Sequence, residues 1–169
     1  MAKSKEIKTN AMRMLDRAKV GYKVHTYECD EFVDAQHIAD QLGQDHRTMY
    51  KTLVTRGKTG AFYVFVIPID GELDRKKAAL SVGEKSVEMI HVKEINSVTG
   101  YIRGGCTPIG MKKQYVTRID QSARELPIVY VSGGRIGAQI ELKPEDLLSV
   151  SKAEYADLLE YDPEDLSAF

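Results

Sequence analysis

The centre of the chain reads Thr48-Met-Tyr-Lys-Thr-Leu-Val-Thr-Arg-Gly-Lys-Thr-Gly-Ala-Phe-Tyr-Val-Phe-Val-Ile-Pro-Ile69. Two runs rich in β-branched and aromatic residues flank a glycine-containing turn, and this pattern predicts a β-hairpin with strands over 48–55 and 61–69. The second run is almost continuously apolar, which is typical of a strand buried on both faces. We expect this hairpin to form the centre of a sheet.

Further strands and helices are predicted on both sides of the hairpin. Strands are expected at 22–27, 87–91, 115–119, 128–132 and 138–142, and the last two form a second hairpin across a pair of glycines. Apolar spacing, capping residues and terminal glycines predict helices at 6–20, 34–42, 73–82, 92–98, 145–150 and 153–160. This order favours one α+β domain over residues 1–169, with a mixed and largely antiparallel sheet.

The composition excludes several classes of protein. The 169 residues are 43% hydrophobic and carry 24 basic and 25 acidic side chains, so the chain can bury an ordinary core but has no basic excess for holding DNA or long RNA. Contact with the end of a nucleic acid stays open. Cys29 and Cys106 match no zinc or redox spacing, although one disulfide remains possible. No apolar run is long enough for a membrane span, and we expect a cytoplasmic protein.

Two features suggest a site for chemistry, and each also has an ordinary structural explanation. The stretch Gly104-Gly105-Cys106-Thr107-Pro108-Ile109-Gly110 exposes backbone N–H groups that can hold an oxyanion, or it is a tight loop. Lys51 interrupts an apolar strand, where it either meets a ligand or points to solvent.

The other motifs give weaker signals. Cys106 has no histidine near it in the sequence, so a thiol nucleophile is the least favoured option. The four histidines lack metal-ligand spacing, which argues against a metal site. The glycines that follow the 128–132 strand open no helix, which argues against a nucleotide cofactor.

Eight segments taken in order resemble the YbaK/EbsC family, free-standing relatives of the editing domain of bacterial prolyl-tRNA synthetases. They are His25-Thr-Tyr-Glu28, Tyr50-Lys-Thr-Leu53, Leu73-Asp-Arg-Lys-Lys77, Val87-Glu-Met89, Thr99-Gly-Tyr101, Gly104-Gly-Cys-Thr-Pro-Ile-Gly110, Tyr130-Val-Ser-Gly-Gly134 and Ile140-Glu-Leu142. The resemblance implies a mixed sheet curved into a partial barrel with helices around it. It also implies hydrolysis of Cys-tRNA(Pro), with Cys-tRNA(Cys) as a second substrate.

The resemblance also implies roles for individual residues. Catalysis is assigned to Lys51 and to the backbone of Gly104 and Gly105, while the substrate's own sulfur attacks its ester carbonyl, so no metal or cofactor takes part. The residues expected to bind the substrate are Tyr27, Phe32, Thr52, Cys106, Thr107, Pro108, Ser132 and Gln139. The expected partners are the CCA end of tRNA(Pro) and, in a transient complex, prolyl-tRNA synthetase.

Two departures from the family pattern bear on the substrate. Gln139 stands where many members carry an aspartate, and the stretch from Cys29 to Ala35, which includes Phe32, is shorter than in familiar members. Both changes can resize the pocket, so another mischarged tRNA such as Ala-tRNA(Pro) is the alternative substrate. A module that binds aminoacyl-tRNA or a synthetase without turnover is the alternative outside the enzyme class.

Overall fold

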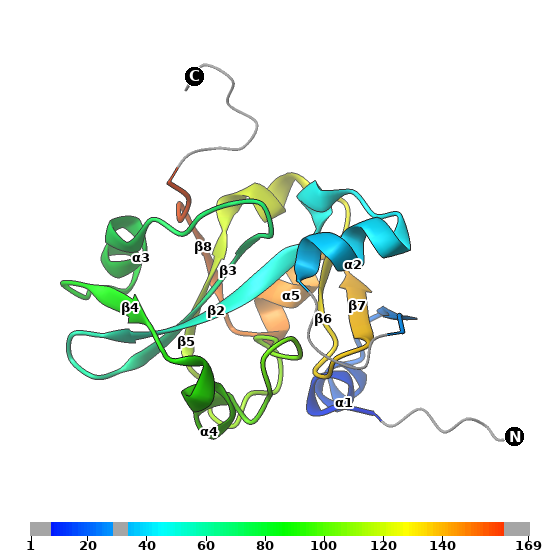
Figure 1. Cartoon of the computed structure of the whole chain (residues 1–169), viewed down its shortest axis with the longest axis horizontal. Coiled ribbons are helices and arrows are strands. Elements are labelled where there is room, and N and C mark those ends of the chain that lie inside the picture. The colour runs from blue at the N-terminus through cyan, green and yellow to red at the C-terminus, as the bar shows by residue number, and fades with distance from the viewer. Residues whose placement is uncertain (1–7, 29–33, 161–169) are drawn as a thin grey trace, which may run out of the picture.

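The computed structural model describes residues 8–28 and 34–160, which form helices around two β-sheets (Figure 1). The helices are α1 (Asn10–Arg17), α2 (Ala35–Leu42), α3 (Arg75–Val82), α4 (Ile95–Thr99) and α5 (Pro144–Val150). The strands are β1 (Lys23–Thr26), β2 (Tyr50–Gly57), β3 (Phe62–Pro68), β4 (Val87–Met89), β5 (Val116–Asp120), β6 (Val129–Ser132), β7 (Ala138–Leu142) and β8 (Glu154–Ala156). The mixture confirms the α+β class.

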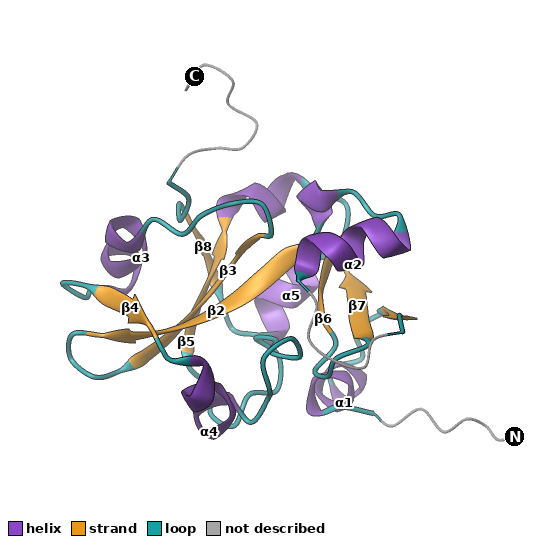
Figure 2. Ribbon diagram, in the orientation of Figure 1, coloured by secondary structure: helices purple, strands orange, loops and turns teal. Residues whose placement is uncertain are grey.

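The larger sheet has the strand order β4-β2-β3-β5-β8 (Figure 2). Its centre is the predicted hairpin, since β2 and β3 pair antiparallel from Tyr50 opposite Pro68 to Arg56 opposite Phe62. Strand β4 pairs antiparallel with β2, whereas β5 and β8 continue the sheet in parallel beyond β3. The sheet is therefore mixed, as the sequence predicted.

The remaining strands form a separate sheet of three antiparallel strands in the order β1-β7-β6. The predicted second hairpin, β6 with β7, is confirmed. The two sheets meet at one isolated bridge between Met49 and Tyr130. The expectation of a single sheet is therefore wrong for the described residues, because a strand pattern shows which segments are extended but not which edges pair. The partial barrel stays a prediction.

Both faces of β3 are buried, which confirms the interpretation of its continuous apolar run. Val64 and Val66 belong to a core that includes Leu15 of α1 and Leu147 of α5. Phe65 packs on the opposite face in a second core that includes residues of α3. Strand alternation sends successive side chains into these two cores.

The predicted caps of α2 are present, and they fix where this helix starts and stops. The Asp34 side chain accepts a hydrogen bond from the His37 amide, and Gly43 ends the helix in the left-handed conformation at φ 67°. Helix α3 is bounded in the same way by Asp74 and Gly83. These local signals decide helix ends without help from the rest of the fold.

Two helix predictions need correction. The helix expected at 6–20 spans only Asn10–Arg17 in the described chain, capped by Thr9. The helix expected at 153–160 is wrong, because Glu154–Ala156 is strand β8 and pairs with the edge of β5. The Asp120 carboxylate also accepts the Leu158 amide at 3.0 Å. Tertiary pairing at an open sheet edge has here overridden a weak helical pattern.

Candidate functional site

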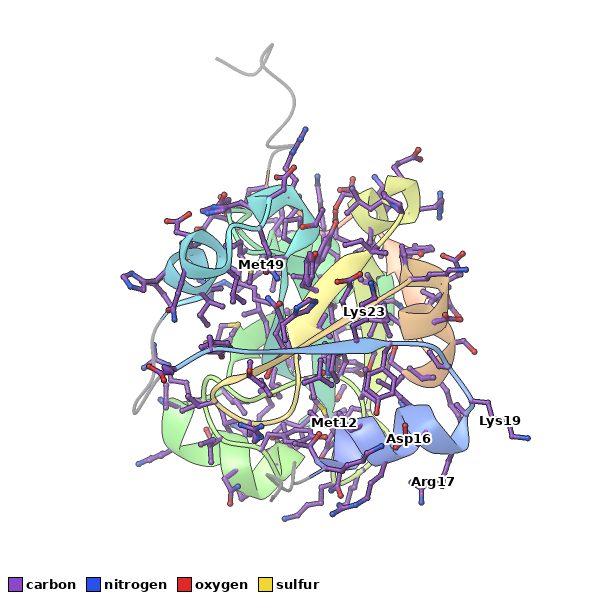
Figure 3. The ribbon with its side chains drawn as sticks, turned by 90° about the vertical axis from the view of Figure 1, so that its right-hand side faces the viewer. Met12, Asp16, Arg17, Lys19, Lys23 and Met49 are labelled. Atoms are coloured by element: carbon purple, nitrogen blue, oxygen red, sulfur yellow. The ribbon has the colours of Figure 1, made fainter. Side chains whose placement is uncertain are left out.

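A cavity of about 490 Å³ lies between the two sheets, where they separate beyond the Met49–Tyr130 bridge. Its walls come from β2, from β6, from the start of β7, from α2 and from the segment that follows α4. Helix α2 and the segment after α4 lie on opposite sides of β2 (Figure 1). Met49, labelled in Figure 3, packs against α2 and lines the cavity.

The structure brings most of the predicted site residues together in this cavity. Those that line it are Tyr27, Lys51, Thr52, Gly104, Cys106, Ser132 and Gln139. Gly105, Thr107 and Pro108 are buried and stand outside the lining. Phe32 lies outside the described residues. Residues from five separate segments thus meet at one place, although no spacing in the sequence links them.

Lys51 supplies a positive charge to the cavity wall. It is half-buried, and within the described part of the chain it makes no hydrogen bond or ion pair. The neighbouring Thr52 hydroxyl is buried and also has no partner in that part of the chain. Both side chains line the cavity because it runs along the edge of β2. A cation and a buried hydroxyl that lack partners in the described chain are suited to bind a polar or anionic ligand.

The backbone of β2 also faces the cavity. The Val54 carbonyl accepts the Ile90 amide on the β4 side of the strand. Because strand residues direct their backbone groups to alternate sides, the N–H and C=O of Thr52 point toward the same edge, where β4 no longer pairs. This edge offers one donor and one acceptor to a bound group.

The glycine loop is clamped between α1 and the turn that joins β6 to β7. A Cβ atom on Gly105 would lie 2.8 Å from the Arg135 Cα, so only glycine fits there. Gly104 precedes it at φ 88° and borders the cavity. The close approach gives Gly105 a packing role, while its catalytic role stays a prediction.

The Tyr101 hydroxyl makes hydrogen bonds to the C-terminal end of this loop, at Ile109 and Gly110. This buried hydroxyl donates to the Ile109 carbonyl at 2.6 Å and lies 3.2 Å from that of Gly110. The Ala11 amide at the start of α1 lies near the same hydroxyl, and burial raises the pKa of Tyr101 to about 12. The neutral phenol therefore links α1 to the loop. The sequence signalled Tyr101 only as part of the resemblance.

Cys106 lines the cavity with a free thiol. Burial raises the pKa of this thiol to about 11, and a hydrogen bond with Thr99 opposes the shift only in part. Since the thiolate is the nucleophilic form, very little of it exists at neutral pH. The geometry gives no support to a thiol mechanism.

Gln139 is buried and forms a reciprocal pair with Gln44, a residue that the sequence analysis did not single out. Each side-chain amide donates to the other's oxygen, at 2.7 and 2.8 Å. The pair joins the end of α2 to β7 beside the cavity. Gln139 therefore presents a neutral amide with one donor and one acceptor site already engaged by Gln44.

A second contact holds α2 from the opposite edge. The two ring nitrogens of His46 lie 2.9 Å from carboxylate oxygens of Asp40, on α2, and of Asp70, after β3. Hydrogen bonds to these two carboxylates raise the pKa of His46. Only the protonated ring can donate to both, so its charge strengthens the attachment of α2.

Comparison with known proteins shows which family the chain belongs to. Residues 29–150 match the family of the aminoacyl-tRNA editing domain. The chain belongs to this family. It is 46% identical over 160 residues to the EbsC protein of Enterococcus faecalis, a proposed Cys-tRNA(Pro)/Cys-tRNA(Cys) deacylase, with 94% of this chain and 98% of that protein covered. The resemblance on which the sequence analysis relied is confirmed.

Solved structures share the fold of this editing domain. The crystal structure of a proposed trans-editing enzyme for prolyl-tRNA synthetase superposes with a TM-score of 0.78 at 26% identity, covering 92% of this chain and all of that one. The hypothetical protein APE2540 gives a TM-score of 0.82 at 24% identity, with 89% and 99% of the two chains covered, and shows the fold alone. In the described residues, no helix has the length and apolarity to cross a membrane.

Proposed function

We propose that this editing domain acts in trans as a deacylase that removes cysteine from mischarged Cys-tRNA(Pro). The coarse activity, deacylation of an aminoacyl-tRNA, follows from the family to which the chain belongs. The observation that carries the finer proposal is the meeting of Lys51, Gly104 and a protonated Cys106 in one cavity. The cavity offers a cation and a glycine backbone to the ester but no thiolate.

The chemistry requires little from the protein because an aminoacyl ester is already activated. The sulfur of the substrate cysteine attacks its own ester carbonyl, so that a C–S bond forms and the C–O bond to the terminal ribose breaks. The thiol proton passes to the departing ribose oxygen, by way of the neighbouring ribose hydroxyl. The products are the cysteine thiolactone, which water then opens, and free tRNA. The protein's task is to hold the reacting groups together.

Lys51 and the glycine loop supply electrostatic stabilisation in this scheme. The carbonyl oxygen gains negative charge as sulfur attacks, and backbone N–H groups beside Gly104 are suited to receive it. The Lys51 ammonium holds the terminal adenosine or its phosphate, since it has no competing partner in the described chain. The Ser132 hydroxyl accepts the Gly134 amide at 3.3 Å, which leaves its own proton free for the substrate.

The charge balance supports a role for a synthetase partner. With 24 basic and 25 acidic side chains, the chain has little overall attraction for the body of a tRNA. We therefore assign the capture of tRNA(Pro) to a transient complex with prolyl-tRNA synthetase. The editing domain itself then engages only the charged CCA end, in the cytoplasm.

The test measures deacylation of Cys-tRNA(Pro), Ser-tRNA(Pro) and Ala-tRNA(Pro) by the wild-type protein. Serine matches cysteine in size but has a hydroxyl in place of the thiol, so the sulfur mechanism predicts that only the cysteinyl ester is cleared. Lys51→Ala should lower kcat/KM by about 100-fold or more. Lys76→Ala, on the surface of α3, is the matched control and should retain activity.

Three outcomes would contradict parts of the proposal. Clearance of Ala-tRNA(Pro) at a comparable rate would exclude sulfur attack and favour hydrolysis by water. Full activity of Lys51→Ala would remove Lys51 from the mechanism. Binding of the charged CCA end without cleavage of any ester would make the protein a binding module.

A further inference from the structure

The cavity contains one acidic side chain among its described lining residues, and it is Asp34. The other charged lining residues, Lys51 and Arg103, are cations. Gln139 is neutral and already paired with Gln44. From the sequence, Asp34 is expected only to cap a helix. Its place in the cavity follows from the way α2 packs over the gap between the sheets.

The cap holds the Asp34 carboxylate in a defined position. Its Oδ1 atom accepts the His37 amide at 2.8 Å, which fixes the side chain against the first turn of α2. Within the described residues, Oδ2 has no hydrogen-bond partner. One carboxylate oxygen is therefore anchored and the other is available, so binding a ligand through Oδ2 requires little further ordering.

Every aminoacyl-tRNA carries an α-amino group next to the ester that is cleaved. Protonated, this group is a cation, and Lys51, which has no partner in the described chain, would repel it within the same cavity. We infer that the free oxygen of Asp34 receives the α-ammonium group of the substrate. This inference rests on the proposed function. It identifies the α-ammonium group as the part of the substrate that the cavity recognises whatever amino-acid side chain the ester carries.

The assignment also orients the ester within the cavity. Asp34 enters from α2, whereas Gly104 belongs to the segment after α4 on the opposite side of β2 (Figure 1). An ammonium at Asp34 places the adjoining carbonyl toward the centre of the cavity, where β2 and the glycine loop supply donors. One anion thus selects aminoacyl esters over neutral acyl esters and sets their direction.

The experiment compares two esters that differ only at this group. Cys-tRNA(Pro) is tested beside its α-hydroxy analogue, mercaptolactyl-tRNA(Pro), which is loaded by an aminoacylating ribozyme and keeps the thiol. Each rate is divided by the spontaneous rate of the same ester at pH 6.5. Wild-type protein should favour the aminoacyl ester by about fivefold in kcat/KM, as expected for one charge-assisted hydrogen bond to an exposed carboxylate.

The decisive variant is Asp34→Asn, because asparagine caps a helix about as well as aspartate and removes only the charge. It should reduce the preference to within about twofold. Asp45→Asn, which removes a capping carboxylate outside the cavity lining, should keep the preference.

The outcomes separate this inference from the proposed function. An unchanged preference in Asp34→Asn, or an equal loss of rate on both esters, would overturn the assignment of Asp34 and leave the deacylase intact. If wild-type protein cleaves neither ester, the proposed function fails and this inference fails with it.

Discussion

The Tyr101 hydroxyl offers the sharpest test of how the glycine loop is held. Tyr101→Phe removes one oxygen and leaves the buried ring in place. The Ile109 carbonyl then loses its 2.6 Å donor, and the Gly110 carbonyl loses a longer contact of 3.2 Å. Ile109 is 0% exposed, so water cannot replace the lost donor without local opening.

The expected cost follows from the unsatisfied Ile109 carbonyl. Leaving one buried polar group unpaired costs about 1–3 kcal/mol, so we expect a loss of about 2 kcal/mol. A domain of this size loses about 2–4 °C in Tm for each kcal/mol, so the Tm should fall by about 4–8 °C. Because the same bond positions the loop that borders the cavity, kcat should fall while the protein is still folded at 25 °C.

The assay is thermal unfolding followed by circular dichroism, together with deacylation kinetics at 25 °C. Tyr22→Phe is the matched control, since its hydroxyl donates to the exposed Asp16 carboxylate, and it should leave the Tm nearly unchanged. A Tm for Tyr101→Phe within 2 °C of wild type would refute the reasoning, because it would mean that the buried Ile109 carbonyl finds another partner.

Four further predictions concern other side chains. Cys106→Ala should retain near-normal deacylation in initial-rate assays, because its thiol, with a pKa of about 11, is protonated at neutral pH; loss of turnover would restore a thiol mechanism. Gln44→Leu and Gln139→Leu should each lower the free energy of unfolding by about 1–3 kcal/mol in denaturant titrations. The double variant should recover part of this loss, and strict additivity would show that the amide pair is not coupled. Thr107→Val should be neutral or stabilising by up to about 1 kcal/mol, because its buried hydroxyl lacks a partner in the described chain; clear destabilisation would indicate a bound water. The raised pKa of His46 means that its contribution to stability is complete below the unfolded pKa near 6.5 and is lost as pH rises through the folded value; NMR titration that finds the pKa at or below 6.5 would contradict this.

Much of the fold could be predicted because its signals are local. The hairpin of β2 and β3 follows from two apolar runs around a glycine turn, and the limits of α2 follow from an aspartate cap and a left-handed glycine. The helix prediction at 153–160 failed for a reason that lies outside the segment. That segment became strand β8 because β5 offered an open edge, and no pattern within the segment reports such an edge.

The candidate site was predicted only in part. The resemblance supplied Lys51, Thr52 and Ser132, and all three line the cavity. Gln44 was missed, since a reciprocal amide pair between residues 95 positions apart leaves no trace in spacing. Asp34 was assigned correctly as a cap, but its position in the cavity lining depends on where the helix packs.

The sequence by itself determined most of the helices and strands and the α+β class, because hydrophobic period, caps and turn glycines act over a few residues. The resemblance of its motifs indicated the family. The tertiary structure alone decided that the strands form two sheets joined at one bridge, and that a cavity opens where they part. It also decided the chemical state of that cavity: a protonated Cys106, a neutral Gln139 and a single described anion at Asp34. The physical reason is that burial, charge and hydrogen bonding depend on neighbours in space, which residues distant along the chain supply.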